Sequence, residues 1–301
     1  MIKKILDPIY RFSHDFLFNT LDFNPFYSNN YGGKKVLKGH ISDIHLQNPE
    51  LDNKLTEELS ESNIPVKNYL IDKNQYNEYL KIANYPQSYY GGGNDTKQNF
   101  TEKTTEHFVS LQFVDFKPET VFIDIAACTS PFYKMVKKLF GVKLSYQQDL
   151  IFEKGLHKDK IGGYASEIPL PDNSVDIVTL HCSLEHFEGD SDTEFFIEME
   201  RVLRKNEKVI ILPFYLASEY TIHIDPAFNT LRFHRPKLDT KARLRYCNWY
   251  QFFSRHYDVN ALRDRILNKT PNLDLEIFRV KNFLEIDKSC YLRFIGVFTK
   301  K

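Results

Sequence analysis

The stretch from Val121 to Asp149 constrains the fold more than any other part of this 301-residue chain. It opens with VFIDI, which is apolar apart from one acid and is typical of a strand buried on both faces. Small residues follow up to Pro131, and apolar residues then recur at helical spacing as far as Phe140. Gly141 can end that helix, and a second strand leads to Asp149. The pattern predicts a strand, a tight turn, a helix and a parallel strand.

The turn between the first strand and the helix predicts a site for a nucleoside-bearing cofactor. Its residues are small, so a ligand can approach the backbone, and N–H groups at the start of a helix are free to bind a ligand. Asp149, at the tip of the second strand, lies where an acid can bind the hydroxyl groups of a ribose. The residues of the turn are Ala126, Ala127, Cys128, Thr129 and Ser130.

Small residues alternate after an acid in this turn: Asp124 is followed by Ala126, Cys128 and Ser130. An NAD site would show G-x-G-x-x-G instead. The order resembles acid-x-G-x-G-x-G, the first motif of class I S-adenosylmethionine-dependent methyltransferases, with all three glycines replaced. Two alternatives stay open on this stretch. One is a βαβ unit of another α/β enzyme, and the other is a non-catalytic protein that kept the fold and lost the cofactor.

A second stretch extends the resemblance along the chain. Residues 165–178 read A-x-x-I-P-x-P-D-x-S-x-D-I-V, and residues 181–217 continue as HCSLEHFEGDSDTEFFIEMERVLRKNEKVIILPFYLA. Both are similar to the third-to-fifth-strand region of the ubiquinone- and menaquinone-biosynthesis-like branch, methyltransferase type 11. In the tail we expect a helix over 259–267 and two strands, 273–283 and 290–299, joined by a short polar turn.

The resemblance implies an α/β fold, with a Rossmann-like, mostly parallel seven-stranded sheet, an antiparallel C-terminal hairpin and helices on both faces. Residues 99–301 would form this methyltransferase domain, with an insertion at 217–257 and a polar connection at 150–160. Residues 1–98 would be an N-terminal extension that serves as a lid, a dimerisation segment or a substrate-binding segment. A homodimer is therefore one of the assemblies that we consider.

The resemblance also implies the cofactor, S-adenosyl-L-methionine, and the residues that bind it. The acid of the first strand would support the turn and the amino group of the methionine part, and the turn would present its backbone. Tyr164 and Ala165 fall where the family often has Asp-Ala beside the adenine, so a phenol replaces the usual acid. The implied cofactor-binding residues are Asp124, Ala126, Cys128, Thr129, Ser130, Asp149, Tyr164 and Ala165.

Three residues after the fourth strand, His181, Glu185 and His186, are candidates for catalysis. Methyl transfer to a hydroxyl group needs alignment and a base, and an imidazole with a pKa of about 6.5 suits that role. His181, at the tip of the strand, is the first choice, whereas His186 is better explained as a loop cap. The three residues lack tight ligand spacing, so we expect no metal.

The expected insertion combines aromatic and basic residues with few acids. Planar rings and guanidinium groups suit a sugar that carries phosphate or carboxylate, although a packed cap with solvated arginines explains the composition as well. A tyrosine next to the glycines at 91–93 offers a further ring face. The candidate substrate-binding residues are Tyr90, Arg232, Arg235, Arg245, Trp249 and Arg255.

Composition and cysteine spacing argue against several other classes. Lys plus Arg and Asp plus Glu each number 40, and this neutral balance argues against nucleic-acid binding by a basic surface. The four cysteines form no C-x-x-C pair, as expected of reduced cytoplasmic thiols. No apolar run reaches the roughly 20 residues of a transmembrane helix. We therefore expect a cytoplasmic methyltransferase, O-directed on a small or glycan-like acceptor, with N-methylation of a small amine as the alternative.

Overall fold

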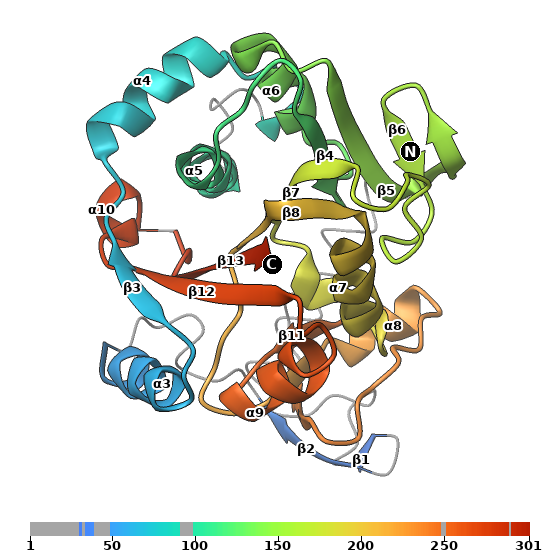
Figure 1. Cartoon of the computed structure of the whole chain (residues 1–301). Coiled ribbons are helices and arrows are strands. Elements are labelled where there is room, and N and C mark those ends of the chain that lie inside the picture. Colours follow the sequence, from blue (N-terminus) through green and yellow to red (C-terminus); the bar gives the residue numbers. More distant parts are fainter. Residues whose placement is uncertain (1–29, 32–33, 39–48, 91–98, 248–250, 289) are drawn as a thin grey trace.

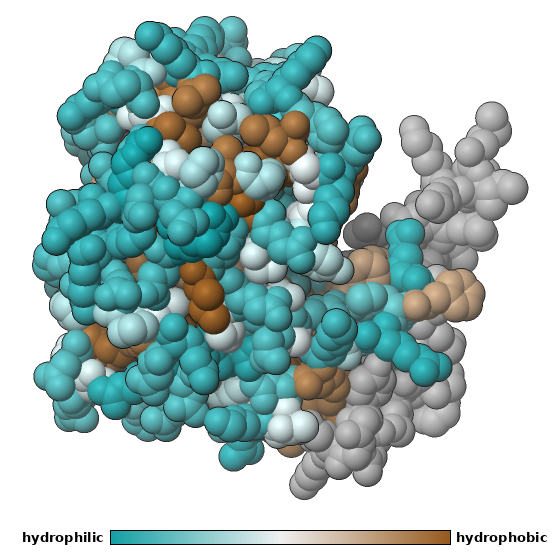
Figure 2. Space-filling view, turned by 45° about the vertical axis from the view of Figure 1, so that its right-hand side comes forward, coloured by the Kyte–Doolittle hydropathy of each residue, from teal (hydrophilic) through white to brown (hydrophobic). Residues whose placement is uncertain are grey.

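The computed structural model describes residues 30–31, 34–38, 49–90, 99–247, 251–288 and 290–301. The glycines at 91–93 and Trp249 lie outside the described residues. No helix in these ranges is long and apolar enough to cross a membrane. Figure 2 shows a face that is mainly hydrophilic, on which apolar side chains form small separate groups. The large apolar clusters lie instead on the two faces of a central sheet.

This eight-stranded sheet has the order β3-β12-β13-β8-β7-β4-β5-β6 (Figure 1). From β8 to β6 neighbouring strands are parallel, whereas β13 runs antiparallel to both β8 and β12. The expected mostly parallel sheet with an antiparallel C-terminal pair is confirmed, but it has one strand more than expected because β3 pairs with β12. The strands are β3 (Val66–Tyr69), β4 (Val121–Ile125), β5 (Leu144–His157), β6 (Lys160–Gly162), β7 (Val175–His181), β8 (Leu203–Leu212), β12 (Leu273–Val280) and β13 (Phe294–Lys300).

Helices cover both faces of this sheet, as expected (Figure 1). Successive residues of a strand point to opposite faces. On β8, Ile211 therefore joins one apolar cluster with Phe196 of α7, and Ile210 joins another with Phe108 of α5. The helical segments are α3 (Pro49–Glu61), α4 (Lys73–Ala83), α5 (Asn99–Ser110), η2 (Leu111–Phe113), α6 (Phe132–Phe140), η3 (Leu184–His186), α7 (Ser191–Val202), α8 (Pro226–Leu231), α9 (Val259–Leu262), η4 (Arg263–Leu267) and α10 (Phe283–Ile286).

A smaller sheet, in the order β1-β2-β10-β9-β11, joins the insertion to the N-terminal part of the chain. Val36 of β2 lies opposite Leu244 of β10 in this sheet, just as Val66 of β3 lies opposite Ile277 of β12 in the large one. Strand pairing therefore crosses the expected division between residues 98 and 99 in both sheets. The strands of the smaller sheet are β1 (Asn30–Tyr31), β2 (Lys34–Lys38), β9 (Thr221–Ile224), β10 (Arg243–Tyr246) and β11 (Ser254–His256).

Some connections differ from the expectation. The polar connection expected at 150–160 is instead the continuation of β5, which runs to His157 and doubles back along β6 with register shifts. Gly162 allows this close approach, because a Cβ there would lie 1.9 Å from the carbonyl oxygen of Glu153. The helix expected over 259–267 is α9 followed by the π-helical η4, and the helix α10 replaces the short turn expected before the last strand.

Candidate active site

The turn after β4 adopts a backbone conformation that normally needs glycine. Ala126 has a φ of 50° and Cys128 a φ of 46°, and residues with a Cβ rarely adopt this left-handed region. In the motif that the turn resembles, both positions are glycines. The chain therefore keeps the backbone of that motif with other side chains, at a cost of roughly 1–2 kcal/mol per residue. Ser130, at the third replaced position, is not among the residues with positive φ.

Asp149 and the two glutamines before it fasten this turn to β5. The Asp149 carboxylate accepts a hydrogen bond from the backbone N–H of Cys128 at 2.7 Å. The side-chain oxygen of Gln148 accepts from the N–H of Ala126 at 3.1 Å, and the side chain of Gln147 donates to the carbonyl oxygen of Cys128 at 2.8 Å. The sequence analysis did not identify either glutamine. Their position directly before Asp149 was the feature that could have indicated them.

A cavity of about 390 Å³ lies beside Asp149, where β4, β5 and β6 end. Sites for small molecules commonly span about 300–1,000 Å³, so this cavity can hold part of a cofactor. The predicted site residues that line it are Ala126, Asp149, Tyr164, Ala165 and His186. The predicted cofactor and catalytic residues absent from its lining are Asp124, Cys128, Thr129, Ser130, His181 and Glu185.

The insertion supplies another part of the wall of this cavity. His234 and Lys237 line it opposite the turn residues, together with Glu188 from the segment after η3. Glu188 joins the two parts, because its carboxylate pairs with His234 at 2.5 Å and accepts from the backbone N–H of Lys237 at 3.0 Å. Sequence reasoning missed all three residues, since their partners lie far apart along the chain.

His181, the expected base, is held by side chains of neighbouring elements. Its Nδ1 lies 3.1 Å from Asp124 Oδ1 and its Nε2 lies 3.2 Å from Ser110 Oγ, so both ring nitrogens are engaged. Its side chain is 6% exposed, and its ring packs against His107 and Phe132. These contacts hold the ring in place, and the role of His181 as the base stays a prediction. The residue ties the tip of β7 to β4 and α5.

The other two catalytic candidates differ in exposure. The side chain of His186 is 40% exposed and lines the cavity, while its Nδ1 lies 2.7 Å from the carbonyl oxygen of Phe253. This contact matches the loop-capping explanation of His186. Glu185 is buried, and its Oε1 accepts from the thiol of Cys182 at 3.1 Å.

Arg255 is wholly buried, which corrects its assignment to a substrate pocket. Its guanidinium group pairs with Asp192 at 2.6 Å and donates to the carbonyl oxygens of Phe187 and Gly189. A buried charge is tolerated only when it is paired and hydrogen-bonded, so this arginine holds the insertion to α7. Arg245 is in turn paired with Glu219 at 3.4 Å.

The remaining predicted substrate residues fall into two groups. Arg232 and Arg235 are exposed and do not line the cavity beside Asp149. The expected pocket of arginines and rings is therefore not assembled among the described residues. Tyr90, by contrast, is half-buried, and its phenol lies within electrostatic reach of Lys103 and Cys182 at the tip of β7.

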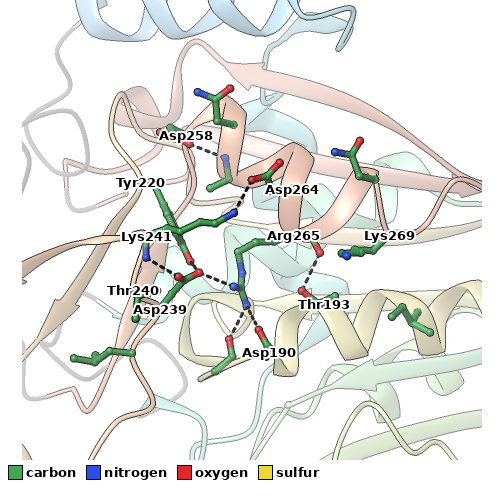
Figure 3. Close-up of a pocket in the computed structure, with 16 residues that line it drawn as sticks. Asp190, Thr193, Tyr220, Asp239, Thr240, Lys241, Asp258, Asp264, Arg265 and Lys269 are labelled. Atoms are coloured by element: carbon green, nitrogen blue, oxygen red, sulfur yellow. Dashed lines mark hydrogen bonds and ion pairs between the residues drawn. The ribbon is translucent and has the colours of Figure 1, made fainter. Parts of the chain in front are cut away.

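A larger cavity, of about 1050 Å³, opens between α7, η4 and residues 238–241, and no predicted site residue lines it (Figure 3). Figure 3 shows Arg265 reaching across it towards Asp239 and Asp190. The arginine donates to Asp239 at 2.6 Å, to Asp190 at 3.2 Å and to Asp192 through two nitrogens. Each nitrogen of its guanidinium group is thus engaged within the protein, so the arginine has a structural role.

Helix α5 brings a second group of charges to the tip of β7. Lys103 Nζ donates to Glu106 Oε1 at 2.7 Å, and Glu106 is fully buried. Burial raises the pKa of Glu106 to about 8, although the positive charge of Lys103 opposes this. Among the described residues, no three His, Cys, Asp or Glu side chains are grouped to hold a metal ion.

The comparison with protein families agrees with the motif and the fold. Residues 123–211 match the family described as "Methyltransferase domain". This part of the chain is a methyltransferase domain of the class I type, and its cofactor is S-adenosyl-L-methionine. The protein is accordingly an enzyme that transfers methyl groups. No curated protein matches the chain.

Solved structures of similar fold come from several organisms. One is 1,6-didemethyltoxoflavin-N1-methyltransferase of Burkholderia thailandensis, with 13% identity, coverage of 79% of this chain and 93% of that chain, and a TM-score of 0.44. Another is the PH0226 protein of Pyrococcus horikoshii, with 16% identity, coverage of 74% and 99%, and a TM-score of 0.45. A third is an S-adenosylmethionine-dependent methyltransferase of Mesorhizobium loti, with 13% identity, coverage of 65% and 98%, and a TM-score of 0.40. Likenesses this distant say nothing about what this chain methylates.

Proposed function

We propose that the chain transfers the methyl group of S-adenosyl-L-methionine to an oxygen atom of a small acceptor. The observation that carries this proposal is the cavity beside Asp149, whose walls include the turn after β4. Its position, at the carboxyl ends of parallel strands, is where α/β sheets bind their ligands. The cofactor supplies an electrophilic methyl group on a positively charged sulfur.

Asp149 would bind the ribose hydroxyl groups, and Tyr164 with Ala165 would lie along the adenine. Asp149 lines the cavity, and one of its oxygens already accepts from the turn at Cys128, so its carboxylate is held in place. The left-handed backbone at Ala126 and Cys128 supports the same assignment, because it reproduces the glycine conformation of the motif. Asp124, Thr129 and Ser130 keep their assignment as cofactor residues, with Asp124 buried below the turn.

The acceptor would approach from the side of α5, between the tips of β7 and β8. Lys103, whose side chain is 16% exposed, lies on that side, and an ammonium group suits an oxygen better than a protonated amine. A glycan acceptor finds less support, since Arg255 and Arg245 are engaged in ion pairs within the protein. We therefore favour oxygen over nitrogen and a compact acceptor over a sugar.

Calorimetry with S-adenosylhomocysteine tests the cofactor site. Asp149→Ala removes charge-assisted hydrogen bonds worth roughly 1.5–3 kcal/mol, so affinity should fall by about tenfold or more. Asp115→Ala is the matched control, because Asp115 is 86% exposed and does not line the cavity. Equal affinity of the two variants would remove Asp149 from the site. A wild-type chain that does not bind S-adenosylhomocysteine would instead be the non-catalytic relative that kept only the fold.

A further inference from the structure

A group of polar side chains lies between α5 and the tips of β7 and β8. We call it the acceptor-side cluster and define it as Tyr90, Lys103, Glu106, Cys182, Tyr215 and Tyr291. The Cys182 sulfur lies 3.5 Å from the hydroxyl of Tyr291 and 3.7 Å from that of Tyr215. Lys103 Nζ lies 5.8 Å from the centre of the Tyr291 ring. Segments far apart in sequence thus converge on one small region.

Exposure divides this cluster into an inner layer and an outer layer. The side chain of Lys103 is 16% exposed, whereas that of Glu106 is 0% exposed. The four other members of the cluster are half-buried and keep accessible surface. Glu106 Oε2 has no hydrogen-bond partner among the described residues, although the side chain is enclosed on all sides. A ligand would therefore touch an ammonium group, phenols and a thiol, with the carboxyl group behind them.

The charge states follow from the surroundings. Burial acts to lower the pKa of Lys103, but the neighbouring acids, which attract the ammonium group in their ionised forms, outweigh it and raise that pKa well above its usual value. Burial raises the pKa of the Cys182 thiol. It also raises the pKa of the phenols of Tyr215 and Tyr291 well above the usual value. The accessible layer thus carries one cation and otherwise neutral groups.

We propose that Lys103 is a catalytic residue that binds the acceptor oxygen, that Glu106 behind it receives the proton, and that the acceptor is a small phenol. This inference rests on the proposed function. A phenol fits the outer layer because its acidic hydroxyl can pair with an ammonium group while its ring packs against the tyrosines. An ordinary alcohol would be far harder to ionise with a single cation.

The proton balance needs only these two side chains. The hydroxyl proton of the phenol moves to Lys103 as the proton that Lys103 shares with Glu106 moves to that carboxylate, so Lys103 stays an ammonium throughout. The phenolic oxygen forms its bond to the methyl carbon while the carbon–sulfur bond breaks and leaves its electron pair on sulfur. Glu106 then releases its proton to water, and the products are an aryl methyl ether and a neutral thioether.

A binding experiment tests Lys103 without any turnover. The full chain, saturated with S-adenosylhomocysteine, is titrated with 4-nitrophenol below the pKa of the free phenol, and the absorption band of its anion is followed. Wild type should bind the probe as the anion, with an apparent pKa lower than that in water. Lys103→Met should lose the anion band while its affinity for S-adenosylhomocysteine stays unchanged. Lys81→Met, an exposed lysine on α4, is the matched control.

Folding is controlled separately, because Lys103→Met leaves Glu106 without its cation. The double variant Lys103→Met, Glu106→Gln carries no unpaired charge at this pair and should melt close to wild type, yet it should also fail to ionise the probe. An anion band that persists in either variant overturns the proposal. So does failure of 4-nitrophenol to bind, or tighter binding of 4-nitrobenzylamine. Loss of S-adenosylhomocysteine binding in the wild type would overturn the proposed function instead.

Turnover of the same probe tests Glu106. Glu106 faces Lys103 and Glu102 on its own helix and His181 on β7, and Tyr89 and Tyr291 lie within electrostatic reach. Since its pKa is raised to about 8, the rate of methyl transfer should climb with pH up to that value and then level off. Glu106→Gln should lower turnover by about 10²–10⁴ and remove this limb. A Glu106→Gln enzyme with an unchanged limb would show that Glu106 does not receive the proton.

Discussion

Two buried groups of charges in this molecule are built in opposite ways. Around Asp192, in the contact between α7 and the insertion, each carboxylate oxygen accepts two hydrogen bonds or ion pairs, from Arg255, Arg265 and Tyr257. Around Glu106, on the acceptor side, one oxygen pairs with Lys103 and the other has no partner among the described residues. Both carboxyl groups are fully buried, so burial does not explain the difference.

The pKa values move in opposite directions as a result. Burial acts to raise the pKa of Asp192, but the hydrogen bonds and charges of Arg265 and Arg255 outweigh it and lower that pKa. For Glu106 burial prevails, and the pKa is raised to about 8. A carboxyl group whose partners are complete stabilises a fold, whereas one left incomplete costs stability and is retained where chemistry needs it.

Removing Asp192, whose two carboxylate oxygens are fully paired, should have the largest effect on stability. Asp192→Ala leaves two arginines without their shared partner, and breaking a buried pair costs roughly 3–5 kcal/mol. Unfolding by urea measures the loss. Asp190→Ala is the control on the same helix end, since Asp190 is 79% exposed and should contribute about 1 kcal/mol or less. Similar losses of unfolding free energy in the two variants would show that the buried pairing of Asp192 does not stabilise the fold as described.

Replacing Glu106, whose pairing is incomplete, should have an effect of opposite sign that depends on pH. Glu106 binds its proton more tightly when folded than when unfolded, where its pKa is about 4.3. Its contribution is therefore favourable at low pH and is lost as pH rises through about 8. Glu106→Gln should match wild type near pH 4 and be more stable by several kcal/mol above pH 8, at about 1.4 kcal/mol for each unit by which the pKa is raised. Wild-type stability that does not fall over this pH range would contradict the raised pKa.

The smallest expected effect concerns the strained turn after β4, which, like Glu106, lowers the stability of the fold at a proposed functional site. Cys128→Gly relieves a left-handed backbone and should raise the free energy of unfolding by about 1 kcal/mol. Ser130→Gly, in the same turn but without positive φ, should lower it by about 0.5–1 kcal/mol. Thermal unfolding of both variants compares them directly. A stabilised Ser130→Gly and a destabilised Cys128→Gly would mean that the turn is not strained as described.

The parts of the fold that were predictable are those governed by local pattern. The buried strand β4, helix α6 and the tail strands follow from runs and periods of apolar residues, and Gly141 ends α6 with a φ of 69° as expected. The extra strand β3 was not predictable, because its partner β12 lies about two hundred positions further along the chain. Local sequence cannot specify such a pairing.

The site divides in the same way. The spacing of small residues identified Ala126 and Cys128 even though the glycines are gone, because backbone conformation rather than residue type recurs there. The contacts of His181 were not predictable, since its partners Asp124 and Ser110 come from other elements. Lys103 and Glu106 were overlooked, although charged residues one helical turn apart beside a buried aromatic residue were a usable signal.

The pairing of β3 with β12 also orders the assembly of this molecule during synthesis. Val66 leaves the ribosome early, yet Ile277, the residue opposite it, emerges almost at the end of the chain. Asp52 of α3 likewise accepts a hydrogen bond from Arg293, which lies 241 positions later in the chain. Contacts of such long range slow folding, because a long loop must close before they form. Helix α3 and strand β3 must therefore stay unpaired while the rest of the chain is made, and this interval is when the nascent protein is most exposed to aggregation.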